Sequence, residues 1–481
     1  MCSDSGTCGI NMGDDSNVIS ALPGSAKRSQ NSGLGSPSRV FVALGLVFGL
    51  AFAALTPPLG SPDEQIHLAR TFLISEGHFR VPGRAPGFEA TFPRSLLTLH
   101  RTLRHAKPMT PPRRFSAAEL RALLAQPLAA ESRRPGTALG SYGPVAYLPQ
   151  ALLLLPGRLL DAPPVVLVYL GRLGNLLAWL AAGWLALRLL PLRGWATCLL
   201  LLTPMAVAQA ASLSADVPTH AAALLVFACA TRAAFGPESL ARRGDLVGLT
   251  VSLGALGLTK PGYWLLAALV VLIPARRFRG RCERVVVYAA TLLAALVPSA
   301  LWLAGAEAAN PLLSPNADPR GQLGFVLGHP LEFAGVLVAT LERNFFGYVI
   351  GFVGVLGHLN VHLPTALHVL FPGALAALAL ADRGDPASLG PARRAALVVI
   401  FLLGALGILS LAYLGWCRVG QAVINGVQGR YFVPFVPLLL LALPARGGRL
   451  PPGLSAWGAA GVAAVSLSIA ATALWRGFFV G

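Results

Sequence analysis

Charged residues are scarce in this protein. Asp, Glu, Lys and Arg make up 12% of its 481 residues, about half of their share in soluble domains. The acidic ones are rarer still, with 20 Asp and Glu against 38 Lys and Arg. Hydrophobic residues account for 55% of the chain, and the mean hydropathy is +0.64. These proportions exclude a soluble globular protein and predict an all-α polytopic membrane protein.

Cysteines are also few, and their spacing matches no metal site. The six cysteines are scattered along the chain, which argues against a disulfide framework and a structural zinc site. The first residues lack the basic and short apolar segments of a cleaved signal peptide. They are polar and rich in Ser, Gly and Asp, so we predict a disordered cytoplasmic tail over residues 1–38.

Basic stretches interleaved with aromatic residues are absent, although the net charge is +18. We therefore expect no nucleic-acid partner. Many of the basic residues fall instead in short links between apolar segments, which is typical of the cytoplasmic side of a membrane protein. Contact with membrane lipids, the anionic ones above all, explains the excess of positive charge.

About eleven apolar segments, within a range of ten to thirteen, are candidate membrane spans. A further apolar stretch, residues 142–160, is not counted as a span because of where the basic residues lie. The five basic links between spans fall on one side of the membrane only if this stretch does not cross, and the N-terminus then lies on that side, the cytoplasm. We interpret residues 142–160 as an interfacial helix on the outer face. The spans are 40–56, 164–188, 195–212, 217–233, 246–259, 261–275, 285–305, 364–381, 395–414, 431–445 and 455–475.

Two large loops lie on the outer face in this topology, residues 57–163 and 306–363. The second has amphipathic character around Leu331–Gly357, which we expect to touch the membrane again. Two short spans flank a Lys-Pro-Gly break at Lys260. This break fits either a broken helix that lines a polar cavity or a plain tight hairpin.

The first outer loop opens with the densest acidic feature beside any apolar segment, Asp63-Glu64. In a helix that begins at Pro62, Asp63, His67 and Arg70 are spaced i, i+4 and i+7 and share one face. Titratable groups held at a membrane surface suit acid/base or phosphate chemistry. Glu64-x-x-His67 also has a metal-ligand spacing. The alternative is that the two carboxylates only cap the helix.

Further ionisable side chains gather at the outer ends of the predicted spans. Asp216 lies between two spans, with His220 one turn on, and ionisable residues at membrane depth indicate function by default. The acidic sites would share an acceptor hydroxyl or a divalent cation, one of them acting as general base. Basic side chains would bind the phosphate of a lipid-linked leaving group; they are Arg172, Lys260 and Arg430. Helix capping by Asp216 and snorkelling of Arg172 are the alternatives.

Six motifs follow one another between roughly residues 40 and 445: PDEQIHLARTFLISEGHF, GSYGPVAYLP, VYLGRLGNLL, SADVPTH, TKPGY and VQGRYFVPFVP. A long outer loop that opens with an acidic pair, followed by an acidic residue at the next outer hairpin, resembles the C superfamily (GT-C) of membrane glycosyltransferases, which use polyprenyl-phosphate sugars. The set is more similar still to a bacterial family filed as domain of unknown function 2142.

The resemblance implies a GT-C-like fold in one membrane domain, residues 39–475, in the bacterial cytoplasmic membrane. It implies that Asp63 or Glu64 binds or activates the acceptor, and that Asp216 is the second acidic residue of the site. We expect hexosyl or pentosyl transfer from a lipid-linked donor to an envelope glycan, lipid or protein. The residues expected to bind substrate are His67, Arg70, Tyr142, Arg172, Lys260, Arg430 and Tyr431.

Two other functions stay open at this point, a transporter or flippase of lipid-linked sugars and a non-enzymatic envelope assembly protein. Charged residues running across the bilayer would favour transport. Carboxylates pointing into different environments would favour the assembly role. No cofactor is implied with certainty, and Mg²⁺ or Mn²⁺ is left open.

Overall fold

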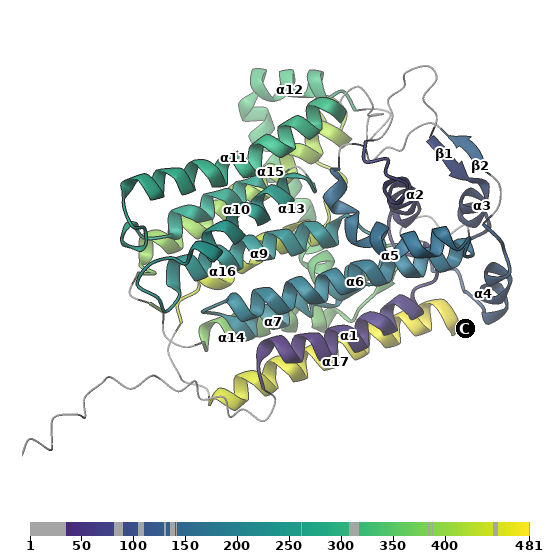
Figure 1. The fold of residues 1–481 in the computed structure, drawn as a ribbon, viewed down its shortest axis with the longest axis horizontal. Helices are drawn as coiled ribbons and strands as arrows, with labels where there is room; N and C mark the ends of the chain where they lie inside the picture. The colour runs from purple at the N-terminus through teal and green to yellow at the C-terminus, as the bar shows by residue number, and fades with distance from the viewer. Residues whose placement is uncertain are drawn as a thin grey trace, which may run out of the picture.

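The computed structural model describes residues 35–80, 90–103, 110–128, 131–134, 140, 142–260, 262–306, 317–382, 385–386, 388–445 and 451–480. The predicted tail lies outside these ranges except for residues 35–38, where the first helix begins. Nearly all of the described elements are helices, and Figure 1 shows them arranged as one bundle with smaller elements gathered at its right-hand end.

Seven of the described helices are long and apolar enough to cross a membrane, by length and composition. Six coincide with predicted spans, and the seventh, α13, falls in the predicted second outer loop. The chain is therefore an all-α polytopic membrane protein. The seven are α1 (Pro37–Leu55), α6 (Pro164–Leu189), α9 (Asp216–Phe235), α11 (Arg281–Ala306), α13 (Pro330–Val353), α15 (Pro391–Trp416) and α17 (Pro452–Phe479).

The other predicted spans are shorter or broken helices. The segment 195–212 breaks before Pro204, where proline ends the first half. Two segments are wound partly or wholly as 3₁₀ helix, among them the nine-residue η2. The elements are α7 (Gly194–Leu201), α8 (Pro204–Ala210), α10 (Arg243–Gly257), η2 (Trp264–Leu272), η3 (Ala275–Arg277), α14 (Thr365–Leu380), η5 (Gly429–Phe435) and α16 (Val436–Ala442).

Both predicted outer loops contain secondary structure of their own. Each carries a two-stranded antiparallel sheet that the all-α prediction did not include, β1–β2 in the first loop and the β3–β4 hairpin in the second. The 142–160 stretch forms η1 and α5, which is too short to be a candidate span and packs along α6 and α2. The elements are α2 (Glu64–Ser75), β1 (Ala90–Pro93), α3 (Arg94–Leu103), α4 (Ala117–Leu124), β2 (Glu131–Arg134), η1 (Pro144–Ala146), α5 (Leu148–Leu159), α12 (Pro319–Gly328), β3 (Val355–Leu356) and β4 (Val361–His362).

The basic segments between spans were predicted to lie on one side of the membrane. In the structure, several of them contact one another at one end of the bundle. Arg193, between α6 and α7, forms an ion pair of 2.7 Å with Asp385, which also pairs with Arg394 of α15. The start of α1 lies at the same end, because Cys198 Sγ donates a hydrogen bond to the Pro37 carbonyl. We call this the basic end.

The first outer loop folds over the opposite end, which we call the loop end. Phe115 N donates to Phe478 O at the end of α17, over 2.9 Å. The α10–η2 segment is a hairpin that turns at the loop end, because Ala241 N, before α10, bonds to Arg277 O, after η2. The tight-hairpin alternative for the Lys-Pro-Gly break is therefore the observed one.

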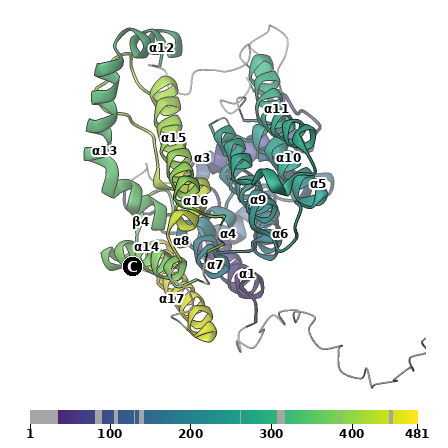
Figure 2. The same cartoon turned by 90° about the vertical axis from the view of Figure 1, so that its left-hand side faces the viewer.

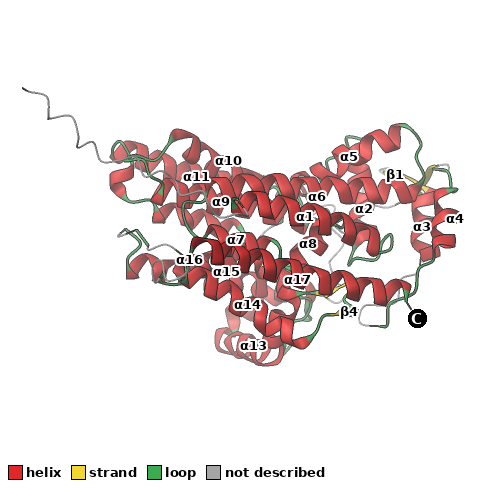
Figure 3. Cartoon of the chain, turned by 90° about the horizontal axis from the view of Figure 1, so that it is seen from below, coloured by secondary structure: helices red, strands yellow, loops and turns green. Residues whose placement is uncertain are grey.

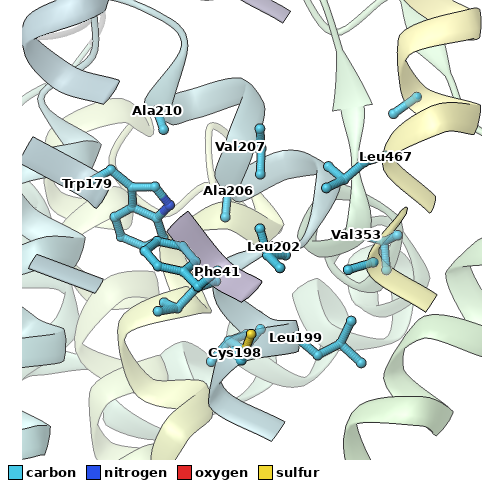
Figure 4. Close-up of a cluster of buried hydrophobic side chains, with 14 of the residues drawn as sticks. Phe41, Trp179, Cys198, Leu199, Leu202, Ala206, Val207, Ala210, Val353 and Leu467 are labelled. Atoms are coloured by element: carbon cyan, nitrogen blue, oxygen red, sulfur yellow. The ribbon is translucent and has the colours of Figure 1, made fainter. Parts of the chain in front are cut away.

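The core and the lipid-facing surface are both apolar, as a membrane protein requires. In the largest core cluster Phe41 of α1 meets Trp179 of α6 edge to face, with ring centroids 6.4 Å apart (Figure 4). On α11, by contrast, Val286 and Leu301 are 64% and 67% exposed. Exposed aliphatic side chains along a long apolar helix fit contact with lipid.

The helix α13 extends from α12, at the top of Figure 2, down the side of the molecule to the β3–β4 hairpin. Near its start Phe333 stacks on Tyr413, close to the loop end of α15, with centroids 5.3 Å apart. Near its end the carbonyl of Tyr348 lies against Gly429. Both ends of α13 therefore contact loop-end segments, as expected for a helix of the second outer loop.

Candidate functional site

The most densely charged buried cluster at the loop end centres on Asp216, in the first turn of α9. Its side chain is buried and forms two ion pairs, with Lys260 Nζ at 2.5 Å from Oδ1 and with Arg430 Nε at 3.0 Å from Oδ2. The three residues come from three separate segments, α9, the turn after α10, and η5. Two cations on one carboxylate leave the cluster with a net positive charge.

Local backbone geometry holds Asp216 in place. Its amide donates a 3.1 Å hydrogen bond to Ser214 Oγ at the helix N-terminus, where a carboxylate also favours the helix dipole. In the amide orientation that satisfies both of its ends, Gln209 donates to Ser214 Oγ and Asp216 Oδ2 and accepts from Arg430 Nη1. The Asp216 side chain thus favours the helix dipole and forms the ion pairs, but it makes no capping hydrogen bond.

The residues around Asp216 are positioned by two glycines, each at a point where two backbone segments lie too close together for a Cβ atom. A Cβ on Gly429 would lie 1.9 Å from the carbonyl oxygen of Tyr348, so only glycine lets η5 pack against α13 and present Arg430. A Cβ on Gly143 would lie 2.2 Å from the carbonyl oxygen of Leu258. The Gly143 amide donates to Thr259 O over 3.0 Å, which sets Tyr142 beside Lys260.

Aromatic rings enclose the Lys260 ammonium. Its Nζ lies 4.8 Å from the ring centroid of Tyr142 and 5.2 Å from that of Tyr431, within cation–π range. Tyr263 OH donates to Tyr431 O at 3.0 Å and holds that residue in place. Burial lowers the pKa of Lys260, but Asp216 and the tyrosines outweigh it and raise the pKa well above its ordinary value. Lys260 is therefore a permanent cation.

Asp63 is the exposed carboxylate of the site. It precedes α2 in the left-handed region, with φ 60°, and its side chain makes no capping hydrogen bond. The capping alternative for this residue is therefore not realised. A non-glycine residue in this conformation is uncommon and clusters at functional sites. Pro62, the residue before Asp63, lines the same small crevice as Arg430, which places Asp63 next to the Asp216 cluster.

Glu64, its neighbour, is wholly buried and paired with Arg172 of α6. Both carboxylate oxygens accept from Arg172 at 2.8 Å, and they also accept from the amides of Ser61 and Leu213. The remaining Arg172 donors reach three carbonyls at the end of α1, those of Ala53, Thr56 and Pro57. All five N–H groups of the guanidinium are used, so this pair joins α1, α2 and α6.

His67 and Arg70 continue the predicted face of α2 but have different surroundings. His67 Nδ1 lies 3.1 Å from Tyr147 OH. Burial, and then the charge of Lys260, lower the pKa of His67 to about 4, against the opposing effect of Asp63. Arg70 instead donates to the carbonyls of His78 and Phe79 beyond the end of its own helix. It stays outside the cluster.

The residues around the site do not fit a divalent-cation centre. Glu64 is directed to Arg172 and His67 to Tyr147, so the Glu-x-x-His spacing does not bring two ligands together. Within the described ranges no three His, Cys, Asp or Glu residues gather closely enough to hold a metal ion.

Sequence reasoning missed three contributors to the site. The first is Gln209, which could have been identified as a polar residue inside a predicted apolar span. Tyr147 and Tyr263 lie in quoted motifs, but their partners come from distant segments. His220 lies one turn after Asp216, and its Nε2 is buried without a hydrogen-bond partner among the described residues.

Comparison with known proteins gives one result that covers most of the chain. The model of a family described as "Predicted membrane protein (DUF2142)" matches residues 46–439, more than half of the chain. All six motifs quoted above lie within the match. No curated protein and no solved structure matches significantly.

Proposed function

The chain belongs to the family described as a predicted membrane protein, DUF2142, and on that premise we propose a reaction from its own geometry. The protein transfers a sugar from a polyprenyl-phosphate donor to an acceptor hydroxyl, at the loop end of a GT-C-like bundle of about eleven spans. The loop end is the outer face of the bacterial cytoplasmic membrane. The observation that carries the proposal is the buried Lys260–Asp216–Arg430 cluster beside the exposed Asp63.

The cluster suits the phosphate of the donor. Lys260 and Arg430 carry two positive charges against one carboxylate, so a phosphate dianion or diester anion has an unbalanced cation to bind. Such cations act strongly on developing charge because the site is buried and low in dielectric. A lipid-linked phosphate reaches membrane depth laterally, which explains why the cations lie at the ends of apolar helices.

Asp63 suits the acceptor. Its carboxylate takes the proton of the acceptor hydroxyl as the oxygen attacks the anomeric carbon of the donor sugar. The new carbon–oxygen bond forms while the bond from that carbon to the phosphate oxygen breaks. The electron pair leaves with polyprenyl phosphate, whose added negative charge Lys260 and Arg430 stabilise. In this scheme Asp216 orients the two cations, and Tyr142 and Tyr431 enclose Lys260.

The remaining carboxylate and arginines hold the site together. Glu64 and Arg172 have no free hydrogen-bonding capacity and fix the chain on both sides of Asp63. We therefore assign the general base to Asp63 and a positioning role to Glu64. Arg172 is assigned to the same clamp and Arg70 to the end of α2.

The two alternatives fit this geometry less well. A transporter needs a polar path between the two ends, whereas the charged clusters described here lie at one end or the other. An assembly protein needs no shared site, yet Pro62, next to Asp63, lines the same crevice as Arg430 of the Asp216 cluster. Convergence of an exposed acid with buried cations favours the enzyme.

The test is the Asp63→Asn variant in cells that lack the native gene. Asn accepts the left-handed backbone and has the same shape, so only the base is lost. Mass spectrometry of envelope glycans and lipid-linked intermediates should show the product with wild type and accumulation of the undecorated acceptor with D63N. The matched control is Asp161→Asn, since Asp161 is also exposed, in the same loop and at positive φ, 49°. Unchanged product with D63N would refute the proposal.

A further inference from the structure

A second cavity lies at the loop end on the other side of the β3–β4 hairpin. It has a volume of about 680 Å³, within the range of ligand sites. Strand β4 lines it together with the start of α14, the last turns of α17 and Pro112 of the first outer loop. Figures 2 and 3 show β4 beside these helices near the C-terminus.

The hairpin separates this cavity from the Asp216 site. Strand β3 and Gly357 line a small crevice that also includes Arg430 and Pro62, next to Asp63. Strand β4 lines the larger cavity. On α17 the same division holds, with Leu474 facing the crevice and Ala473 the cavity. The hairpin therefore separates the cavity from the residues next to Asp63.

The lining of the cavity has an apolar and a polar part. Leu363, Ile469 and Ala473 supply aliphatic surface. Asn360, His362, Ser468 and Thr472 supply hydrogen-bonding groups, and Arg476 is the charged residue among the described residues of the lining. This combination fits an amphiphile, with a chain against the aliphatic side and a polar head at the other.

Arg476 defines the charge of that head. It is exposed in the last turn of α17, and no ion pair or hydrogen bond to its side chain is found within the described ranges. The end of a membrane-spanning helix lies at the level of lipid headgroups. A guanidinium free at that depth attracts phosphate, which it matches with two parallel N–H donors.

We propose that this cavity binds a phosphate-bearing anionic lipid from the membrane leaflet at the loop end, and that this lipid carries the acceptor. The acceptor part rests on the proposed function; the lipid site itself does not. The headgroup lies against Arg476, the chain lies along the apolar side, and a glycan on the headgroup passes the hairpin tip toward Asp63. The protein then holds two lipids at once, the donor at Lys260 and Arg430 and the acceptor on the far side of the hairpin.

The binding test uses the full-length protein in nanodiscs of phosphatidylcholine that contain a photo-crosslinking phosphatidylglycerol. Cross-linked peptides are mapped by mass spectrometry. We expect labelling of residues 360–364 and 468–477, reduced about fivefold in Arg476→Gln, the effect of one basic residue on an anionic lipid. Arg476→Lys should retain most of the labelling, and Ala473→Trp, which fills the apolar side, should lose it.

Controls separate the possible ligands. Arg188→Gln alters an exposed arginine in the last turn of another span, α6, and should leave the labelling of these peptides unchanged. Equal labelling by a phosphatidylcholine probe would overturn recognition of the phosphate anion. Displacement of the probe by millimolar inorganic phosphate would overturn a lipid as the source. Labelling that R476Q and A473W both leave unchanged would overturn the site.

The acceptor role has a separate readout. D63N should lose transfer but keep full labelling, whereas R476Q should lower labelling and raise the KM for the acceptor with little change in kcat. Transfer by R476Q with an unchanged KM would refute the acceptor role and leave the proposed reaction intact. Loss of labelling in D63N would refute the separation of the two sites.

Discussion

Replacing Glu64 with Gln and Asp63 with Asn distinguishes a structural carboxylate from a reactive one at adjacent positions. Glu64 is fully buried and accepts four hydrogen bonds, two of them from Arg172. In E64Q the Arg172 charge stays buried without its counter-ion. Removing one partner of a buried ion pair typically costs about 3–5 kcal/mol. Asp63 is exposed and makes no side-chain hydrogen bond within the described ranges, so D63N should change stability by less than about 0.5 kcal/mol.

The measurement is thermal unfolding of the purified full chain in detergent. Unfolding entropy scales with chain length at about 2.1 cal/mol/K per residue. For 481 residues a loss of about 3–5 kcal/mol then lowers Tm by about 3–5 °C. Helices that persist in detergent reduce the entropy and make the shift larger. Glu332→Gln is the control, since its side chain is 64% exposed, and it should not change Tm.

The two variants should affect transfer in the opposite order to stability. D63N abolishes transfer at unchanged Tm, while E64Q protein that remains folded retains transfer at a temperature below its own transition. The result that refutes the reasoning is E64Q with the Tm of wild type. Residual transfer by D63N near the level of D161N would refute the assignment of the base. Either outcome would give the two carboxylates different roles from those assigned here.

Three further predictions address the surroundings of the site. Lys260→Gln removes a cation from the leaving phosphate and should lower transfer about 100-fold or more in an assay with labelled donor; transfer above a tenth of wild type would contradict it. Gly429→Ala should lower the free energy of unfolding by about 1–3 kcal/mol and lower Tm, because the new Cβ would lie 1.9 Å from a carbonyl oxygen of α13. The control is Gly458→Ala, in open space on α17, which should leave Tm unchanged. Burial and then Lys260 lower the pKa of His67 from 6.5 to about 4, so between these values the unfolded chain binds a proton that the folded chain does not. Stability should therefore fall as pH drops from 7 to 5, by roughly 2 kcal/mol from this group, and Tm of His67→Gln should fall less than that of wild type.

Much of the helical framework could be predicted because membrane spans depend on local composition. Segments 40–56 and 164–188 were identified within a few residues of α1 and α6, since a long apolar run has few other stable conformations. Charge distribution also indicated that 142–160 does not cross. The helix α13 was assigned to the second outer loop because its sequence is amphipathic around Leu331–Gly357; its hydropathy, 1.4, is also lower than that of most other candidate spans.

The pairing of side chains could not be predicted to the same extent. The residue types of the cluster were identified, because a charge at membrane depth is conspicuous in an apolar sequence. Which carboxylate meets which cation depends on packing between segments far apart in the chain. Glu64 and Arg172 are 108 positions apart, and nothing local distinguishes a saturated Glu64 from an exposed Asp63. The four strands are also too short for a periodic signal.

The winding of η2 determines how far Lys260 reaches. A 3₁₀ helix rises about 2.0 Å per residue and an α-helix about 1.5 Å, so these nine residues extend roughly 18 Å where an α-helix would extend roughly 13.5 Å. The difference is about the diameter of a methyl group. If the same residues formed an α-helix, the turn that carries Lys260 would be drawn back along the bundle axis by roughly that distance, away from the carboxylate of Asp216. The 3₁₀ winding thus lengthens a nine-residue segment that is shorter than a bilayer is thick.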